Sequence, residues 1–89
     1  MAKHLDVNIY GQVQGVGFRF AVEKVASGLG ICGFVKNLGD GVYLEAEGEE
    51  QQLKEFLKWC QQGPIWSKVA KVETQEGQVK NYQSFSIAD

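Results

Sequence analysis

A glycine-rich stretch, Gly11–Arg19 (GQVQGVGFR), links a strand-like alternating run, His4–Tyr10, to a helix-like run over Phe18–Leu29. Its three glycines let the backbone adopt positive φ and let another group come close to it. A glycine-rich turn that opens a helix points several unpaired N–H groups at one place, where the helix dipole adds a positive potential. The stretch therefore predicts a strand–loop–helix unit with an anion site, most simply for phosphate, at the loop.

Arg19 is the only arginine of the chain, beside eight lysines, and it falls in the first turn of the predicted helix. A cation there faces the positive end of the helix dipole, which costs roughly 0.3–1 kcal/mol unless an anion is bound. A guanidinium fork can also hold two phosphate oxygens at once, which a lysine cannot. The spacing alone leaves two interpretations open, a phosphate-binding arginine or a solvated arginine beside a tight turn.

The composition is that of a folded protein, because 44% of the 89 residues are hydrophobic and 22% are charged. This length predicts one domain over residues 1–89. A net charge of −2 argues against a nucleic-acid binder. The sequence has no apolar run of membrane-spanning length and no signal-peptide core after its start, MAKHLDVN. We therefore expect a cytoplasmic protein that binds neither nucleic acid nor membrane, and a monomer.

The cysteines, Cys32 and Cys60, are far apart, form no CxxC pair and each fall in an apolar pattern. They are expected to be buried structural thiols, since a cytosolic setting disfavours a disulfide. A zinc site would need more ligands than these two residues and the single histidine, His4, can supply. We therefore expect no metal site.

Hydrophobic periodicity alternates along the chain between the two-residue period of a strand and the three- to four-residue period of a helix. The order strand, helix, strand, strand, helix, strand is typical of a split βαβ layout. Two helices would cover one face of a mostly antiparallel sheet of four to five strands, and the other face would meet water. The expected strands are 4–10, 31–37, 42–47, 67–74 and 85–87, the helices are 18–29 and the segment between Glu49 and Gly63, and 75–84 is a loop.

Asn37 ends the second predicted strand, and in this layout it could lie at the same end of the sheet as the glycine-rich turn. An asparagine before a turn is common for purely local reasons, so Asn37 alone favours a structural role. The two stretches together are more specific. Gly11–Arg19, followed by Gly33–Asn37 (GFVKN), Gly41–Val42 and Gly48, closely resembles the two signature patterns of acylphosphatases.

This resemblance covers nearly the whole chain, because the length, the element order and the segment SKVAKVET also match the family. It implies a ferredoxin-like α+β fold and hydrolysis of the carboxyl–phosphate bond of acyl phosphates, with no cofactor or metal. The substrate would be a small-molecule acyl phosphate, with inorganic phosphate as product and inhibitor. The resemblance assigns the positioning of the attacking water to Asn37. It assigns phosphate binding to Arg19 and to the backbone amides of Gln14, Gly15, Val16, Gly17 and Phe18.

The predicted site offers no evident general acid, general base or nucleophile. His4 would lie at the far end of the first strand and is expected at the surface. Glu23, one helical turn past Arg19, is expected to be its i,i+4 neighbour. Glu45 and Glu47 share one side of a strand and are expected to be solvated.

So sparse a site indicates which bond it can break. An alkoxide leaving group would need a proton donor or a metal. A carboxylate leaves without help, because the pKa of its conjugate acid is about 4. Phosphoryl transfer otherwise asks mainly for positioning and for stabilisation of charge on the phosphoryl oxygens. The residues therefore favour a mixed anhydride over a phosphate monoester.

Two other functions compete with an acylphosphatase. An RNA-binding module of this fold would want exposed aromatic residues and a basic surface, whereas the predicted third strand offers Tyr43 between acidic residues. An anion-sensing or carbamoyl-phosphate-handling domain would resemble the acylphosphatase-like segment of a hydrogenase maturation protein. Such segments belong to much longer chains, so a chain ending at Asp89 leads us to expect a free-standing enzyme.

Overall fold

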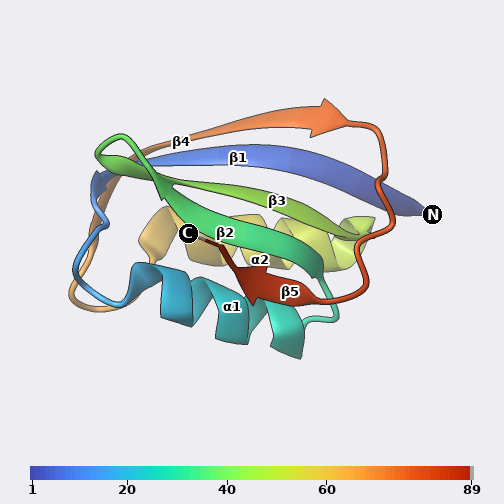
Figure 1. The fold of residues 1–89 in the computed structure, drawn as a ribbon, viewed down its shortest axis with the longest axis horizontal. Helices are drawn as coiled ribbons and strands as arrows, with labels where there is room; N and C mark the ends of the chain where they lie inside the picture. The colour runs from blue at the N-terminus through green and yellow to red at the C-terminus, as the bar shows by residue number, and fades with distance from the viewer. Residues whose placement is uncertain (89) are drawn as a thin grey trace.

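The computed structural model describes residues 1–88, in which two helices pack on one face of a five-stranded sheet (Figure 1). The strand order is β4-β1-β3-β2-β5, and neighbouring strands are antiparallel except for β2 and β5, which are parallel. This mixed sheet confirms the expected ferredoxin-like α+β fold. The elements are β1 (Ala2–Gln12), α1 (Phe18–Gly28), β2 (Cys32–Leu38), β3 (Gly41–Glu49), α2 (Glu50–Gln62), β4 (Lys68–Gly77) and β5 (Phe85–Ile87).

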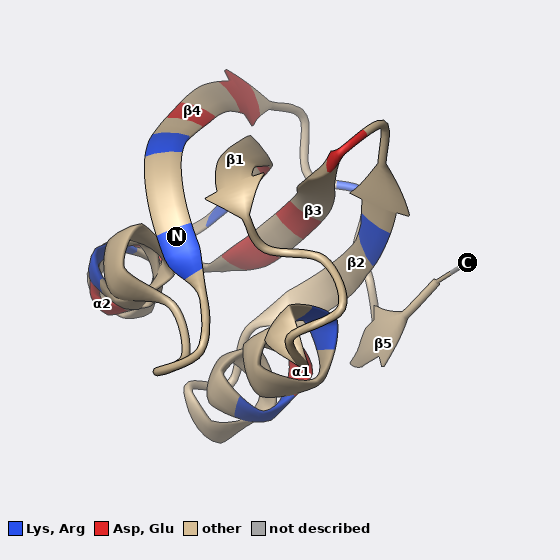
Figure 2. Cartoon of the chain, turned by 90° about the vertical axis from the view of Figure 1, so that its left-hand side faces the viewer, with Lys and Arg blue, Asp and Glu red and all other residues tan. Residues whose placement is uncertain are grey.

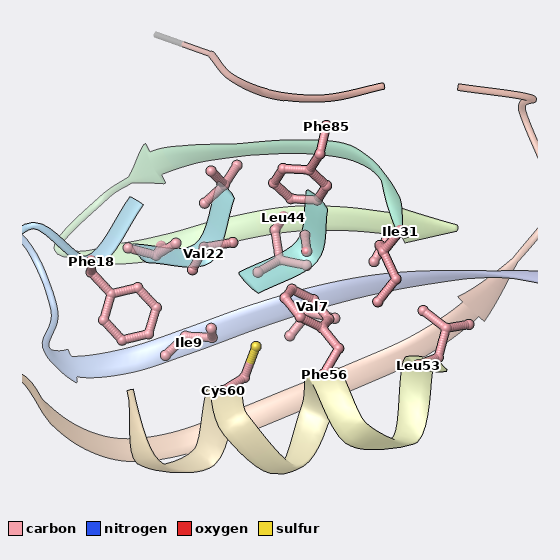
Figure 3. Packing of buried hydrophobic residues seen from close by; sticks show 14 of the residues in the cluster. Val7, Ile9, Phe18, Val22, Ile31, Leu44, Leu53, Phe56, Cys60 and Phe85 are labelled. Carbon is pink, nitrogen blue, oxygen red and sulfur yellow. The ribbon is translucent and has the colours of Figure 1, made fainter. Parts of the chain in front are cut away.

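The core lies between the helices and the sheet, and its apolar residues follow the predicted periods. Figure 3 shows Phe56 and Cys60 of α2 pointing towards β1, while Phe18 lies at the start of α1. Burial raises the pKa of the Cys60 thiol to about 12, so it stays protonated as a structural residue. Cys32 is only half-buried, which corrects the expectation that both thiols are buried. Both cysteines are free.

The fourth strand is longer than its side-chain pattern predicts. β4 continues to Gly77, which pairs with His4, so the expected loop over 75–84 begins only after Gly77. Backbone pairing with β1 extends the strand, because ladder hydrogen bonds do not need apolar side chains. The remaining segment, 78–84, runs from β4 at one edge of the sheet to β5 at the other (Figure 1). No helix within residues 1–88 is long and apolar enough to span a membrane.

Segment 78–84 covers part of the sheet face that the helices leave open, and this overturns two expectations. His4 is 1% exposed and Glu47 is 5% exposed, so neither is solvated. The Glu47 carboxylate accepts the backbone N–H groups of Lys80 and Tyr82, and it lies 2.7 Å from Nδ1 of His4. The other ring nitrogen of His4 lies 2.8 Å from the Asp6 carboxylate.

Glu45, expected in solvent, is buried beside Glu47 on the same face. Its carboxylate accepts the hydroxyls of Tyr43 and Tyr82, each at 2.6 Å, and the Lys80 ammonium at 3.0 Å. Burial alone would raise the pKa of Glu45, but these three hydrogen bonds outweigh it and lower the pKa to about 2. The His4 cluster is the name used below for His4, Asp6, Tyr43, Glu45, Glu47, Lys80 and Tyr82.

Candidate active site

The loop between β1 and α1 has the backbone conformation that its glycines predict. Gly15 and Gly17 have φ angles of 75° and 77°, in the left-handed region that L side chains rarely adopt. Gly17 is also the N-cap residue of α1, and it provides no side-chain cap for the amides of the first turn. The loop therefore presents its N–H groups without a local acceptor.

The backbone N–H groups of Gln14–Phe18 donate to no hydrogen-bond acceptor among residues 1–88. Buried or half-buried amides normally have a partner in the folded chain or in water. At the N-terminus of a helix, such unpartnered amides combine with the dipole to favour a bound anion.

The side chain of Gln14 connects this loop to the turn between β2 and β3. Its Nε2 donates to the carbonyl oxygen of Gly39 at 2.9 Å and to that of Gly41 at 2.8 Å. Asn37 lies two residues before Gly39 at the end of β2. Gln14 therefore holds the loop next to the strand end that carries Asn37.

A pocket of about 160 Å³ opens at this end of the sheet. Figure 2 shows the β1–α1 loop, the start of α1 and the end of β2 close to one another at this end. Of the predicted site residues, Gly15, Gly17, Phe18, Arg19 and Asn37 line it. Gln14 and Val16 lie in the same loop but do not line the pocket. The lining residues of the described part of the chain are Val13, Gly15, Gly17, Phe18, Arg19, Phe20, Asn37 and Ile87.

Arg19 is half-buried and makes no ion pair with any of residues 1–88. The first turn of α1 carries no acidic residue that would offset its charge. Glu23, its expected i,i+4 neighbour, forms no ion pair with Arg19, and the Glu23 carboxylate accepts the Ser27 hydroxyl at 2.9 Å. Arg19 is thus a cation at the positive end of a helix, which an anion in the pocket would stabilise.

Among residues 1–88, Arg19 is the only ionisable side chain that lines the pocket. His4 lies at the opposite end of β1, as predicted, although it is buried there. Within residues 1–88, the lining therefore offers hydrogen-bond donors, one fixed positive charge and the side-chain amide of Asn37, but no group for general acid–base catalysis.

Phe20 and Ile87 also line the pocket, and the sequence patterns do not identify them. Phe20 lies off the apolar stripe of α1 and is 63% exposed, so its position outside the stripe is a signal that could have been used. Ile87 reaches the pocket through the parallel pairing of β5 with β2, in which Val35 is its partner. That pairing joins distant segments and leaves no local signal.

Comparisons with known proteins agree with this fold and this site. Residues 5–87 match the sequence model of the acylphosphatase family. A relative from Archaeoglobus fulgidus named acylphosphatase is 47% identical, covering 94% of this chain and 96% of its own. The crystal structure of acylphosphatase from Bacillus subtilis superposes with a TM-score of 0.95 at 34% identity, covering 100% of both chains.

A crystal structure of full-length HypF, in a phosphate- and nucleotide-bound form, superposes equally well. Its TM-score is 0.95 at 34% identity, covering 100% of this chain and 12% of that one. The family-model match and the identity to curated relatives lead to the same assignment. This chain belongs to the acylphosphatase family.

Proposed function

We propose that this chain hydrolyses the carboxyl–phosphate bond of acyl phosphates, releasing a carboxylate and inorganic phosphate, as an acylphosphate phosphohydrolase. The observation that carries the proposal is the pocket in which Arg19, loop amides and the side-chain amide of Asn37 meet; the loop amides have no acceptor and Arg19 has no acidic partner among residues 1–88. Membership of the acylphosphatase family supports the same reaction.

The loop amides and Arg19 together bind the phosphoryl group. The phosphoryl oxygens accept hydrogen bonds from the N–H groups of Gln14–Phe18 and from the Arg19 guanidinium, whose planar fork suits two oxygens. These donors are held by the loop glycines and by the Gln14 bridge, so they need little reorganisation when charge shifts during the reaction.

The chemical step is a substitution at phosphorus by water. The Asn37 side-chain carbonyl accepts a hydrogen bond from the water and directs its oxygen at phosphorus. A new phosphorus–oxygen bond forms, the phosphorus–oxygen bond to the acyl group breaks, and its electron pair stays on the departing carboxylate. The water proton passes to a phosphoryl oxygen or to solvent.

The leaving group accounts for the sparse lining of the pocket. A carboxylate has a conjugate acid of pKa about 4, so no protein group has to protonate it. The site then needs only to position the reactants and stabilise charge, which amides and one arginine do. We propose that the reaction needs no cofactor.

We also propose that the chain acts in the cytoplasm as a single-domain monomer on freely diffusing substrates, with inorganic phosphate as a competitive product inhibitor. A monomer would carry the full set of proposed site residues, because the pocket forms within a single chain. Light scattering in line with size-exclusion chromatography tests the oligomeric state, and a dimer mass would contradict it.

A steady-state assay with benzoyl phosphate and a phosphate monoester tests the reaction. The enzyme should hydrolyse benzoyl phosphate and leave the monoester at its background rate. Asn37→Ala should lower kcat about 100-fold while inorganic phosphate still competes with substrate. Asn8→Ala, which replaces an asparagine of β1 outside the pocket lining, is the matched control and should keep full activity.

Three outcomes would contradict the proposal. Equal turnover of the monoester would contradict the argument from the leaving group. A loss of phosphate inhibition in Asn37→Ala would make Asn37 a binding residue rather than one that positions water. Phosphate binding without turnover of any acyl phosphate would favour the anion-sensing domain.

A further inference from the structure

Two apolar side chains stand at the mouth of the pocket, exposed to solvent. Phe20 of α1 is 63% exposed and Ile87 of β5 is 38% exposed. The other apolar side chains of the lining, Val13 and Phe18, are each 1% exposed and belong to the core. Phe20 and Ile87 therefore contribute little to the core, and they leave apolar surface next to an anion site.

The size of the pocket places the acyl group of the substrate at this mouth. A volume of about 160 Å³ is well below the roughly 300–1,000 Å³ of pockets that enclose drug-sized ligands. A phosphoryl group held by the loop amides and Arg19 takes the polar part of this space. The acyl group, one oxygen further out, then lies towards the exposed side chains of the lining.

We propose that Phe20 and Ile87 form the binding surface for the acyl group, and that they make the enzyme prefer acyl phosphates with apolar acyl chains. This inference rests on the function proposed above. A methylene group that moves from water to such a surface is favoured by the removal of apolar area from solvent. A carboxylate at the same position would lose hydration without gaining a partner from these two side chains.

One cation lies near this surface and defines the main alternative. The Lys24 ammonium is 5.8 Å from the centre of the Phe20 ring, one helical turn further along α1. With Arg19, it could attract a second anionic group on the acyl chain. An aromatic ring beneath an ammonium already stabilises that cation, so Lys24 needs no anionic ligand to explain its position.

The test measures kcat/KM for acetyl, butyryl and hexanoyl phosphate, with succinyl phosphate as the anionic analogue of butyryl phosphate. The three aliphatic acids have similar acidity, so the leaving group stays constant while apolar length increases. We expect kcat/KM to rise about tenfold from acetyl to hexanoyl phosphate, and to be lower for succinyl than for butyryl phosphate. Phe20→Ala and Ile87→Ala should each reduce the hexanoyl-to-acetyl ratio severalfold.

Ile65→Ala is the matched control, because Ile65 is 87% exposed and does not line the pocket. It should keep the wild-type ratio. Equal kcat/KM across the aliphatic series would overturn the acyl surface while leaving the proposed reaction intact, as would a ratio that survives both mouth substitutions. Preferential hydrolysis of succinyl phosphate, lost in Lys24→Ala, would replace the apolar surface with an anionic subsite. If the enzyme hydrolysed none of these compounds, the proposed function itself would be overturned.

Discussion

Arg19 and Glu47 are charged groups, one beside the β1–α1 loop and the other under segment 78–84. The loop and the segment lie at opposite ends of the sheet (Figure 1). Glu47 is 5% exposed, and its carboxylate accepts hydrogen bonds from two backbone N–H groups. It also lies within hydrogen-bond distance of the His4 ring. Arg19 is half-buried and has no acidic partner among residues 1–88. The described part of the chain thus contains one polar cluster whose groups have hydrogen-bond partners, the His4 cluster, and one whose groups lack them, at the pocket.

The difference separates what stabilises the fold from what binds a ligand. A buried polar network whose hydrogen bonds are all made fixes one arrangement of the chain, here segment 78–84 against the sheet. An unsaturated group lowers stability in the empty protein, and a ligand that completes it restores the loss. The pocket end should therefore control activity, and the His4 cluster should control stability.

The largest effect is expected from a substitution at the pocket end. Arg19→Ala should lower kcat/KM for benzoyl phosphate about 1,000-fold, because it removes a fixed positive charge from a preorganised site. The free energy of unfolding should stay the same or rise by roughly 0.3–1 kcal/mol, since an unfavourable interaction with the helix dipole disappears. Steady-state kinetics and urea denaturation measure the two quantities.

Arg19→Lys sharpens the same test. It keeps the charge but loses the planar fork, so it should restore little of the activity. Near wild-type turnover by the lysine variant would show that charge alone is sufficient. A large loss of stability in Arg19→Ala would place Arg19 in the fold rather than in the site.

A smaller effect is expected from a substitution in the His4 cluster, at the opposite end of the sheet. Glu47→Ala should lower the free energy of unfolding by about 2–3 kcal/mol, because it leaves buried donors on His4 and segment 78–84 without an acceptor. Activity per folded molecule should remain within a fewfold of wild type. Glu73→Ala is the control, since Glu73 forms an exposed ion pair with Lys71 and should change stability much less than Glu47→Ala does.

If Glu47→Ala abolished turnover in fully folded protein, the two ends would not be separable. One link between them is β5, which follows segment 78–84 and carries Ile87 into the pocket. A change in the preference for acyl chain length, without a change in kcat for acetyl phosphate, would indicate that this link transmits the effect.

The next effect comes from ligand binding. Inorganic phosphate at ten times its Kd should stabilise the folded state by about 1.4 kcal/mol, because it binds the native pocket and not the unfolded chain. The melting temperature should rise accordingly in wild type and in Glu47→Ala, and should not rise in Arg19→Ala. Sulfate-free buffer and a matched chloride concentration control for general salt effects. An equal shift of the melting temperature in all three proteins would show that phosphate does not stabilise them by binding in this pocket.

The pocket end could be predicted from sequence because its determinants are local. Gly15 and Gly17 sit where the chain turns from strand to helix, and Arg19 follows within one helical turn. Asn37 needed one further step, the split βαβ layout, which brings the end of β2 beside the loop. Local turn chemistry and element order account for where these residues lie, whereas their roles in binding phosphate and positioning water rest on the resemblance to acylphosphatases.

The His4 cluster could not be predicted in this way. The alternation of β1 and β3 correctly places His4 and Glu47 on the face away from the helices. Whether that face is wet depends on a segment far along the chain, and segment 78–84 is polar in sequence. Its backbone amides, not its side chains, bind Glu47, so no residue pattern reveals the contact.

The smallest effect is a pH dependence at the His4 cluster. Burial alone would lower the pKa of His4, but hydrogen bonds with Glu47 and Asp6 outweigh it, so the pKa lies above its ordinary value of 6.5. His4 therefore contributes stability below about pH 6.5, and this contribution is lost as the pH rises through the folded-state pKa. Glu45 acts in the opposite sense, because its pKa is lowered to about 2 and its contribution is lost as the pH falls from 4.5 to that value.

The cluster should thus be most stabilising between about pH 4.5 and 6.5, the ordinary pKa values of its glutamates and histidine. Urea denaturation of the wild type should show that the free energy of unfolding falls between pH 6 and pH 9, with a contribution from His4 of about 1 kcal/mol or less. His4→Gln keeps a polar side chain without a titrating proton, so it should lack this part of the loss. The two proteins share every other titrating group, and identical losses would mean that His4 is neutral at both pH values. In that case the imidazolium does not link Glu47 to Asp6, and the backbone amides of segment 78–84 stabilise Glu47 without it.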